Sequence, residues 1–231
     1  MKVEIFETKA LRNLETGEII LLPYRYVELQ PNDLLIVKYG NDLYGIIDQE
    51  GNEIVSPKYD AIGAFNNGLA RVRNEKDLWG IINEEGKEIV SPKYKLIEDF
   101  KDGLAKVQVE NSLWGIINEE GEEIVSPKYK FIENFKDGLA KVQGENSLWG
   151  IINKEGKEIV SPKYKFIGGF KDGLAKVEGE NSLWGISNEE GKEIVSPKYK
   201  LVWGFNDGFE DEVLIINKAN ATYQIIRGDE E

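Results

Sequence analysis

Residues 79–94 (WGIINEEGKEIVSPKY) contain the pattern that decides the fold of this chain. A Trp-Gly or Tyr-Gly pair recurs every 35 residues, and each copy is followed by the same Ile-rich run, Gly turn and Ile-Val-Ser-Pro run. The recurring pairs are Tyr44-Gly45, Trp79-Gly80, Trp114-Gly115, Trp149-Gly150 and Trp184-Gly185. A constant period of this length indicates a tandem repeat in which each unit buries its apolar surface against its neighbours.

The elements of the repeat are expected to be strands. Each unit contains three short β-rich runs separated by Gly, Asn, Asp and Pro, and none has the length and 3.6-residue spacing of a helix. Residues 83–86 fit a hairpin loop in which Gly86 takes a positive φ, and Asp102-Gly103 fits a second turn of the same chemistry. A fourth strand would have to lie within residues 95–100, which could equally form an irregular connection. We therefore expect an all-β fold with three or four strands per unit.

The Trp-Gly strand carries apolar residues on both faces. A period of two places Trp79 and Ile81 on one face and Gly80 and Ile82 on the other. Such a strand is expected between two covering layers, with a buried Trp, and the space at Gly80 would accept a bulky group from the neighbouring sheet, with Tyr94 and Phe100 as candidates. The structural anchors predicted for the repeats are Trp79, Gly80, Trp114, Gly115, Trp149, Gly150, Trp184 and Gly185.

The two chain ends contain partial units, residues 1–42 and 200–231, that complement each other. The N-terminal part lacks a Trp-Gly strand, whereas residues 222–226 supply one of that type, so that each strand class then has six copies. Pairing of the strand near Ile20 with the strand near Ile225 would close a six-bladed β-propeller and remove both free sheet edges. The alternative is an open β-solenoid or curved β array, because 35 residues is short for a blade of about 40–45. Residues 1–231 are thus expected to form a single repeat domain.

Composition excludes several classes of function. The chain has no Cys and no His, so it lacks thiol chemistry, the usual general base near neutral pH and the commonest metal ligand. Its net charge of −13 disfavours nucleic acid and anionic lipid as partners. The acidic N-terminal residues do not resemble a secretory signal, and no apolar run is long enough for a membrane span. We expect a cytoplasmic monomer without a cofactor.

Three recurring polar patterns are candidate sites, and each has a simpler structural interpretation. The series Asp102, Asp137, Asp172 and Asp207 could bind a cation, but Asp before Gly is ordinary turn chemistry. Glu84-Glu85 could form an acid/base pair, yet hairpin tips are solvated and do not raise a carboxyl pKa. Lys93-Tyr94-Lys95 could stack on nucleic-acid bases, although a core Tyr between solvated Lys side chains suits the acidic chain better. We expect no catalytic, cofactor or metal site.

Trp203 is the clearest break in the repeat symmetry. It lies outside the Trp-Gly register, at a position that Gly63, Glu98, Glu133 and Gly168 occupy in other units. An aromatic residue is therefore not required there by the scaffold. Packing under the last unit is the favoured interpretation, and Trp203 is also the one weak candidate for a partner-binding residue.

The repeated motif closely resembles the bacterial WG repeat family. The resemblance covers residues 43–208 and includes Leu-Trp-Gly-Ile-Ile-Asn, Ile-Val-Ser-Pro-Lys-Tyr and Phe-x-x-Gly-Leu-Ala-x-Val, with departures at Tyr44 and Ser187. It implies a β-rich repeat scaffold that is not tied to one enzymatic activity, and it brings no catalytic residues.

Three function hypotheses follow from the sequence. The leading one is a non-enzymatic scaffold that binds a protein or a polymer with a repeating structure, because identical units offer avidity at matched spacing. The second is an acidic inhibitor or immunity-type protein that neutralises a basic enzyme, suggested by the net charge. The remote third is a hydrolase that uses paired carboxylates.

Overall fold

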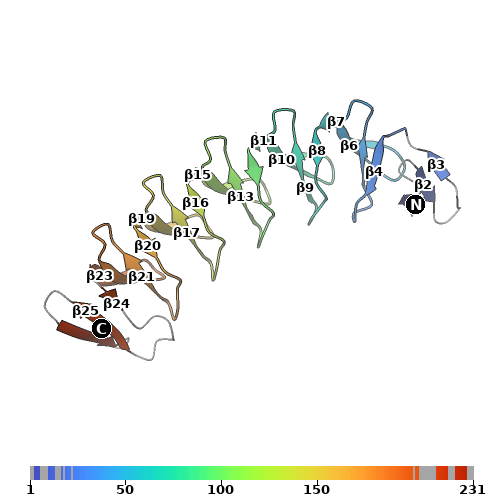
Figure 1. The fold of residues 1–231 in the computed structure, drawn as a ribbon. Coiled ribbons are helices and arrows are strands. Elements are labelled where there is room, and N and C mark those ends of the chain that lie inside the picture. The colour runs from blue at the N-terminus through green and yellow to red at the C-terminus, as the bar shows by residue number, and fades with distance from the viewer. Residues whose placement is uncertain are drawn as a thin grey trace. The chain divides into compact units, whose positions relative to one another are not determined.

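The computed structural model describes residues 3–5, 10–13, 17, 19–21, 23–199, 201–202, 212–217 and 222–227. All regular elements in these ranges are β-strands, which confirms the all-β expectation (Figure 1). Within the same ranges, no helix has the length and apolar character needed to cross a membrane.

The strands form seven sheets that follow one another along the chain. The N-terminal sheet contains β1 (Val3–Ile5), β2 (Ala10–Asn13) and β3 (Ile19–Leu21). The second contains β4 (Tyr26–Leu29), β5 (Leu35–Lys38), β6 (Tyr44–Ile47) and β7 (Glu53–Tyr59). The third contains β8 (Ala61–Ile62), β9 (Leu69–Arg73), β10 (Trp79–Asn83) and β11 (Glu88–Tyr94).

The remaining sheets keep the same lengths and spacing until the last one. The fourth contains β12 (Leu96–Ile97), β13 (Leu104–Gln108), β14 (Trp114–Asn118) and β15 (Glu123–Tyr129). The fifth contains β16 (Phe131–Ile132), β17 (Leu139–Gln143), β18 (Trp149–Asn153) and β19 (Glu158–Tyr164). The sixth contains β20 (Phe166–Ile167), β21 (Leu174–Glu178), β22 (Trp184–Asn188) and β23 (Glu193–Tyr199). The C-terminal sheet contains β24 (Leu201–Val202), β25 (Glu212–Asn217) and β26 (Thr222–Arg227).

Each complete repeat is one four-stranded antiparallel sheet whose strands lie in sequence order. The segment that the sequence left open as strand or irregular connection forms the short first strand, as β12 does with Leu96 opposite Gln108. The three longer runs form the other strands. Because every connection between neighbouring strands within a sheet is short, the fold of a repeat is set by local pairing.

The predicted turns adopt the expected backbone conformations. Gly86 has a φ of 75°, and Asp102 and Gly103 have φ values of 49° and 77°. Asp137 and Asp172 repeat the value of Asp102 to within a degree. Two successive residues with positive φ form the hairpin turn that suits the twist of antiparallel strands, and Asp and Gly tolerate it best. The Asp series therefore has the predicted turn role at its three described positions, and Asp207 lies outside the described residues.

The glycine of the Trp-Gly pair has a different role from the expected one. A Cβ atom on Gly80 would lie 2.7 Å from the backbone nitrogen of Pro92 and 2.9 Å from its Cδ, so the space is filled by the next strand of the same sheet. The β10–β11 pairing shifts register between Trp79 and Ile82, which marks a bulge in the ladder. The prediction that Tyr94 fills this space from a neighbouring sheet was wrong, because sequence periodicity does not reveal a bulge.

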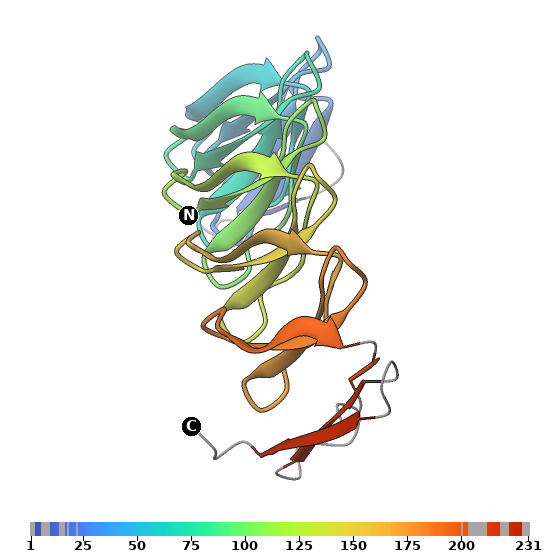
Figure 2. The same cartoon turned by 90° about the vertical axis from the view of Figure 1, so that its left-hand side faces the viewer.

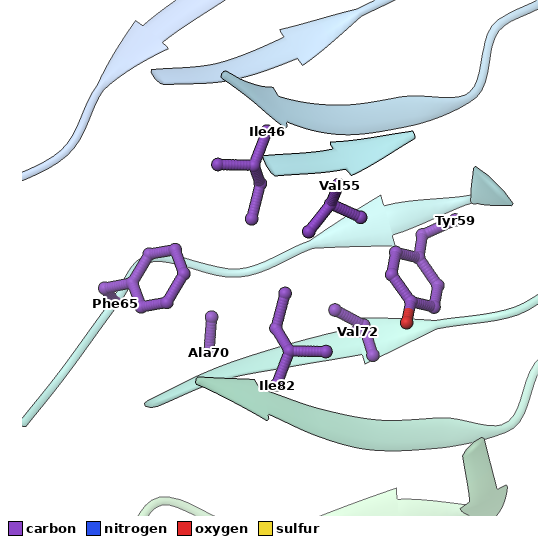
Figure 3. Packing of buried hydrophobic residues seen from close by; sticks show 7 residues of the cluster. All are labelled: Ile46, Val55, Tyr59, Phe65, Ala70, Val72 and Ile82. Atoms are coloured by element: carbon purple, nitrogen blue, oxygen red, sulfur yellow. The ribbon is translucent and has the colours of Figure 1, made fainter. Parts of the chain in front are cut away.

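Neighbouring sheets pack face to face through small clusters of aliphatic side chains. One cluster joins the second and third sheets and contains Ile46, Val55, Tyr59, Phe65, Ala70, Val72 and Ile82 (Figure 3). The equivalent cluster between the fifth and sixth sheets contains Ile151, Val160, Tyr164, Ile167, Ala175 and Val177, and Figure 2 shows these two sheets one after the other. Successive residues of a central strand thus pack against the preceding and the following sheet in turn, as Ile82 and Ile81 do. This confirms the expectation of sheets covered on both sides.

The contacts divide the chain into two compact units, Met1–Ser112 with Ile116–Glu123, and Leu113–Gly115 with Ile124–Glu231. In the N-terminal sheet β2 pairs with β3 and takes the place that the sequence left without a Trp-Gly strand. In the C-terminal sheet β26 pairs with β25. The proposed pairing between residues near Ile20 and Ile225, the closed six-bladed ring and the single domain of residues 1–231 stay predictions.

The bulge predicts that the glycine of a Trp-Gly pair tolerates no side chain. A Cβ atom at Gly150 would lie 2.8 Å from the Pro162 nitrogen, so we expect Gly150→Ala to lower the free energy of unfolding by about 1–3 kcal/mol through overpacking. Urea denaturation measures the change. Gly169→Ala is the matched control, because no atom lies within 4 Å of the added group. It should leave stability unchanged or slightly raised, and equal losses in both variants would contradict the steric argument.

Candidate functional site

The Trp side chains of the repeats are not fully buried, contrary to the sequence expectation. All four have intermediate exposure, whereas the four glycines that follow them are buried. Trp149 is partly buried and packs against the cluster that contains Ile151 and Tyr164. It begins its strand, so its indole lies at the margin of the sheet rather than above its centre. The Trp residues therefore connect the core to the surface.

The repeated Lys-Tyr pair forms a clamp with the next sheet, which we call the Lys-Tyr-Glu clamp. The Tyr hydroxyl donates to a Glu Oε1 in the next sheet, and the preceding Lys pairs with the same oxygen. The four Tyr-to-Glu distances are 2.8 Å for Tyr59–Glu88, 2.8 Å for Tyr94–Glu123, 2.6 Å for Tyr129–Glu158 and 2.6 Å for Tyr164–Glu193. The corresponding Lys to Glu distances are 2.8–3.0 Å.

The clamp adds contacts to the predicted role of the Lys-Tyr-Lys triplet. Tyr94 is 1% exposed, so the expectation of a core Tyr is confirmed. Lys93 is also exposed as expected, with 53% of its side chain accessible, and it pairs with Glu123 at 2.9 Å and lies 4.9 Å from the centre of the Tyr94 ring. Lys93 and Tyr94 both contact Glu123 of the next sheet, so the triplet links two neighbouring sheets.

Titration behaviour in the clamp follows from this geometry. Burial and the hydrogen bond to Glu123 raise the pKa of Tyr94 to about 12. The hydrogen bonds from Lys128 and Tyr129 hold the pKa of Glu158 below its usual value. At neutral pH the phenol is therefore a donor and the carboxylate an acceptor, and both are fixed in those states. The clamp is suited to holding sheets together.

Two small pockets open between neighbouring sheets at equivalent repeat positions. One lies near Asn67, Arg71 and Phe100 and has a volume of about 50 Å³. The other lies near Asp137, Lys141 and Phe170 and has a volume of about 120 Å³. Gly168-Gly169 stands in the larger pocket where Glu98-Asp99 stands in the smaller one.

The carboxylates at these pockets are largely engaged with cations. Glu98 pairs with Lys106 at 3.1 Å, Asp99 with Arg71 at 3.0 Å, and Glu133 with Lys141 at 3.0 Å. Over the described part of the chain, no three His, Cys, Asp or Glu residues gather as a metal-binding group.

The exposed large apolar side chains concentrate at one position of the repeat. Among the described residues they are Tyr26, Leu96, Phe131, Phe166 and Ile194, with exposed fractions of 40–46%. Four of these five occupy the same register position, in the short first strand of their sheets. Scattered exposed apolar residues are ordinary, but a recurring position is not explained by chance exposure.

Three of these residues, Tyr26, Phe131 and Phe166, each belong to a row of three side chains that crosses the sheet, which we call the rim row. Strand pairing places Phe131 opposite Gln143 and Gln143 opposite Trp149. The rings of Phe131 and Trp149 meet edge to face with centroids 6.1 Å apart, and those of Phe166 and Trp184 do so at 5.8 Å. The described rim rows within one unit are Tyr26/Lys38/Tyr44, Ala61/Arg73/Trp79, Phe131/Gln143/Trp149 and Phe166/Glu178/Trp184.

Sequence reasoning missed the rim row. It identified the Trp members as core anchors and did not single out Phe131 or Phe166. The available signal was the 35-residue recurrence of Leu96, Phe131 and Phe166 directly after a Lys. Trp203, the weak partner-binding candidate, lies outside the described residues.

Comparison with known proteins identifies the repeat. The sequence model of the WG containing repeat matches residues 44–76, 79–112, 114–147, 149–182 and 184–209, well over half of the chain. No curated protein matches the sequence.

Several solved structures resemble the chain at low similarity. BamB from Moraxella catarrhalis is 9% identical, with a TM-score of 0.32 over 94% of this chain and 78% of that one. Hsv2p from Kluyveromyces lactis is 12% identical, with a TM-score of 0.34 over 97% and 93%. The WD40 β-propeller domain of Doa1 is 8% identical, with a TM-score of 0.30 over 99% and 89%.

The clamp predicts a pH-dependent contribution to stability. Folding lowers the pKa of Glu158, so its contribution is present above the unfolded pKa of about 4.3 and is lost as pH falls through the folded value. We expect Glu158→Gln to reduce the free energy of unfolding by about 1 kcal/mol at neutral pH, allowing for solvent screening, and by less at about pH 3. Denaturant unfolding at both pH values measures this. Ser161→Ala, an exposed change on the same strand, should match wild type, whereas a Glu158→Gln loss independent of pH would refute the clamp.

Proposed function

The chain belongs to the WG containing repeat family, and we propose that it is a non-enzymatic binding scaffold whose rim rows hold a partner with repeated elements. A repeat of nearly identical units presents the same chemical group at regular intervals. A partner that is itself periodic gains one contact with each unit that it reaches.

The observation that carries this proposal is the concentration of exposed apolar side chains at one register position. Phe131 and Phe166 are each 46% exposed and lie in successive sheets of one unit. Each ring is held in place by its edge-to-face contact with the Trp of the same sheet. Fixed aromatic side chains are favourable contact residues, because little rotamer freedom is lost when they bind.

The edges of the sheets favour recognition through side chains rather than strand addition. The outer strand β19 contains Pro162, which has no N–H to donate, and the opposite edge strand β16 contains only two residues. Short edge strands and edge prolines are features that prevent pairing with another chain. A partner of the fifth sheet would therefore contact exposed side chains, among which the rim row supplies the large apolar ones.

Repetition compensates for the weakness of each contact. One aromatic contact contributes about 0.5–1.5 kcal/mol, which is too little for a stable complex. Two or more rows that bind the same molecule make the later contacts intramolecular, and such linkage commonly raises affinity by about 10²–10⁴. The proposal thus requires a polymeric or multivalent partner.

A binding test follows from the position of the rim row. The immobilised protein is screened against a random peptide library and a printed glycan array, and each ligand found is titrated against variants. Phe131→Ser combined with Phe166→Ser should weaken binding by tenfold or more, because two apolar contacts are lost together. Ile194→Ser is the matched control, because Ile194 is 43% exposed but outside the rim rows. It should bind like wild type.

Two outcomes would overturn the proposal. In the first, no peptide or glycan binds the wild-type chain. In the second, the double variant and the Ile194→Ser control bind equally well. The free energies of unfolding of both variants are measured alongside, so that a folding defect is not taken for a loss of binding.

A further inference from the structure

The middle positions of the rim rows carry no consistent charge. They are Lys38 and Arg73 in the first unit, and Gln143 and Glu178 in the second. Each lies between its aromatic or apolar neighbours on the same face of the sheet. A polymer with one repeated charge would find a matching partner in some rows and a neutral or repelling group in others.

The net charge of the chain also argues against a charged polymer as the partner. A net charge of −13 repels polyanions at long range. A polycation would be attracted at long range but would meet Lys38 and Arg73 at the centres of two rows. The rim row therefore suits a neutral partner, recognised through apolar contact and hydrogen bonds.

The aromatic rings are bordered by hydrogen-bonding groups that the protein itself holds in place. Next to Phe131, the Lys130 ammonium donates to Ser147 Oγ at 3.0 Å and the Gln143 amide to the Ser147 carbonyl at 3.0 Å. The Asn146 amide donates to the Pro162 carbonyl at 3.2 Å.

The next sheet repeats the same border around its aromatic pair. Lys165 donates to Ser182 Oγ at 2.9 Å, and the Asn181 amide donates to the Pro197 carbonyl at 3.4 Å. Each aromatic pair thus has an ordered polar border that includes amide, hydroxyl and ammonium groups, in two successive sheets.

We infer that the rim rows bind a neutral polysaccharide, an inference that rests on the proposed binding function. A sugar ring has apolar C–H faces that pack on aromatic rings, and hydroxyl groups at its edge that both donate and accept hydrogen bonds. Hydroxyl groups can pair with Gln143 and with Glu178 alike, so a neutral glycan tolerates the change of charge between rows. It also has no ionic charge to desolvate at a row that lacks a counter-charge.

The spacing of the rows suits an extended glycan chain. Sheets that pack face to face lie roughly 10 Å apart, and the fifth and sixth sheets pack in this way through Ile151, Val160 and Val177. A short run of linked sugar rings spans such a distance, so one glycan chain can reach both aromatic pairs. Binding is expected to strengthen with glycan length until two rows are occupied.

Affinity electrophoresis of the full chain in gels that contain soluble polysaccharides tests the inference. The neutral panel comprises hydroxyethylcellulose, pullulan and mannan, and carboxymethylcellulose is the anionic counterpart of the first. At least one neutral polymer should retard the wild-type chain, and Phe131→Ser with Phe166→Ser should raise its dissociation constant about tenfold or more. Ile194→Ser should be retarded like wild type.

The outcomes separate this inference from the function on which it rests. Retardation of wild type only by a charged polymer, or equal retardation of the double variant, would overturn the neutral glycan. If no neutral polymer binds but library peptides bind through Phe131 and Phe166, the glycan inference fails while the scaffold function stands. If neither class of ligand binds, both fail.

Discussion

Each described four-stranded sheet depends on a neighbouring sheet to keep its Ile and Val side chains away from water. A single four-stranded sheet has an apolar residue on each face of its central strands and no helix to cover either face. The cluster around Ile46 and Val72 shows the consequence, because three of its seven members lie on strands of one sheet, three on strands of the next, and Phe65 on a connection of the latter (Figure 3). Stability is therefore a property of neighbouring pairs, and an isolated repeat would expose most of the surface that drives folding.

Two devices make this stacking specific. The missing side chain at Gly150 lets the Pro-containing strand approach closely where the β18–β19 ladder shifts register. Tyr164, at the end of that strand, then reaches Glu193 in the following sheet at 2.6 Å while its ring stays buried. Apolar burial supplies the driving force, and the clamp fixes which sheet faces may meet. A buried phenol without its carboxylate would carry an unsatisfied hydroxyl.

The Trp residues connect this packing to the surface. Trp149 packs against the core cluster and also contacts Phe131, so the aromatic pair at the rim rests on the same interface that stabilises the fold. An exposed aromatic ring on a flexible loop would lose conformational freedom on binding. Here that cost is met during folding, which is the physical basis for treating the rim row as a binding surface.

The sequence by itself determined the class of fold and the content of each repeat. A fixed period, alternating apolar residues and Asp-Gly or Gly turns are local properties, and they were sufficient to predict the three longer strands of each repeat, the turn at Asp102-Gly103 and the covered faces, while the short first strand was left open. Only the tertiary structure decided the bulge at Gly80, the pairing of Lys93 with Glu123, and the exposure of Phe131 beside Trp149. Each of these depends on which residue of one strand or sheet stands opposite which residue of the next. A period of two assigns a side chain to one face of its sheet. It does not say which part of that face the neighbouring sheet covers, so it does not distinguish a buried ring from one at the edge of the interface.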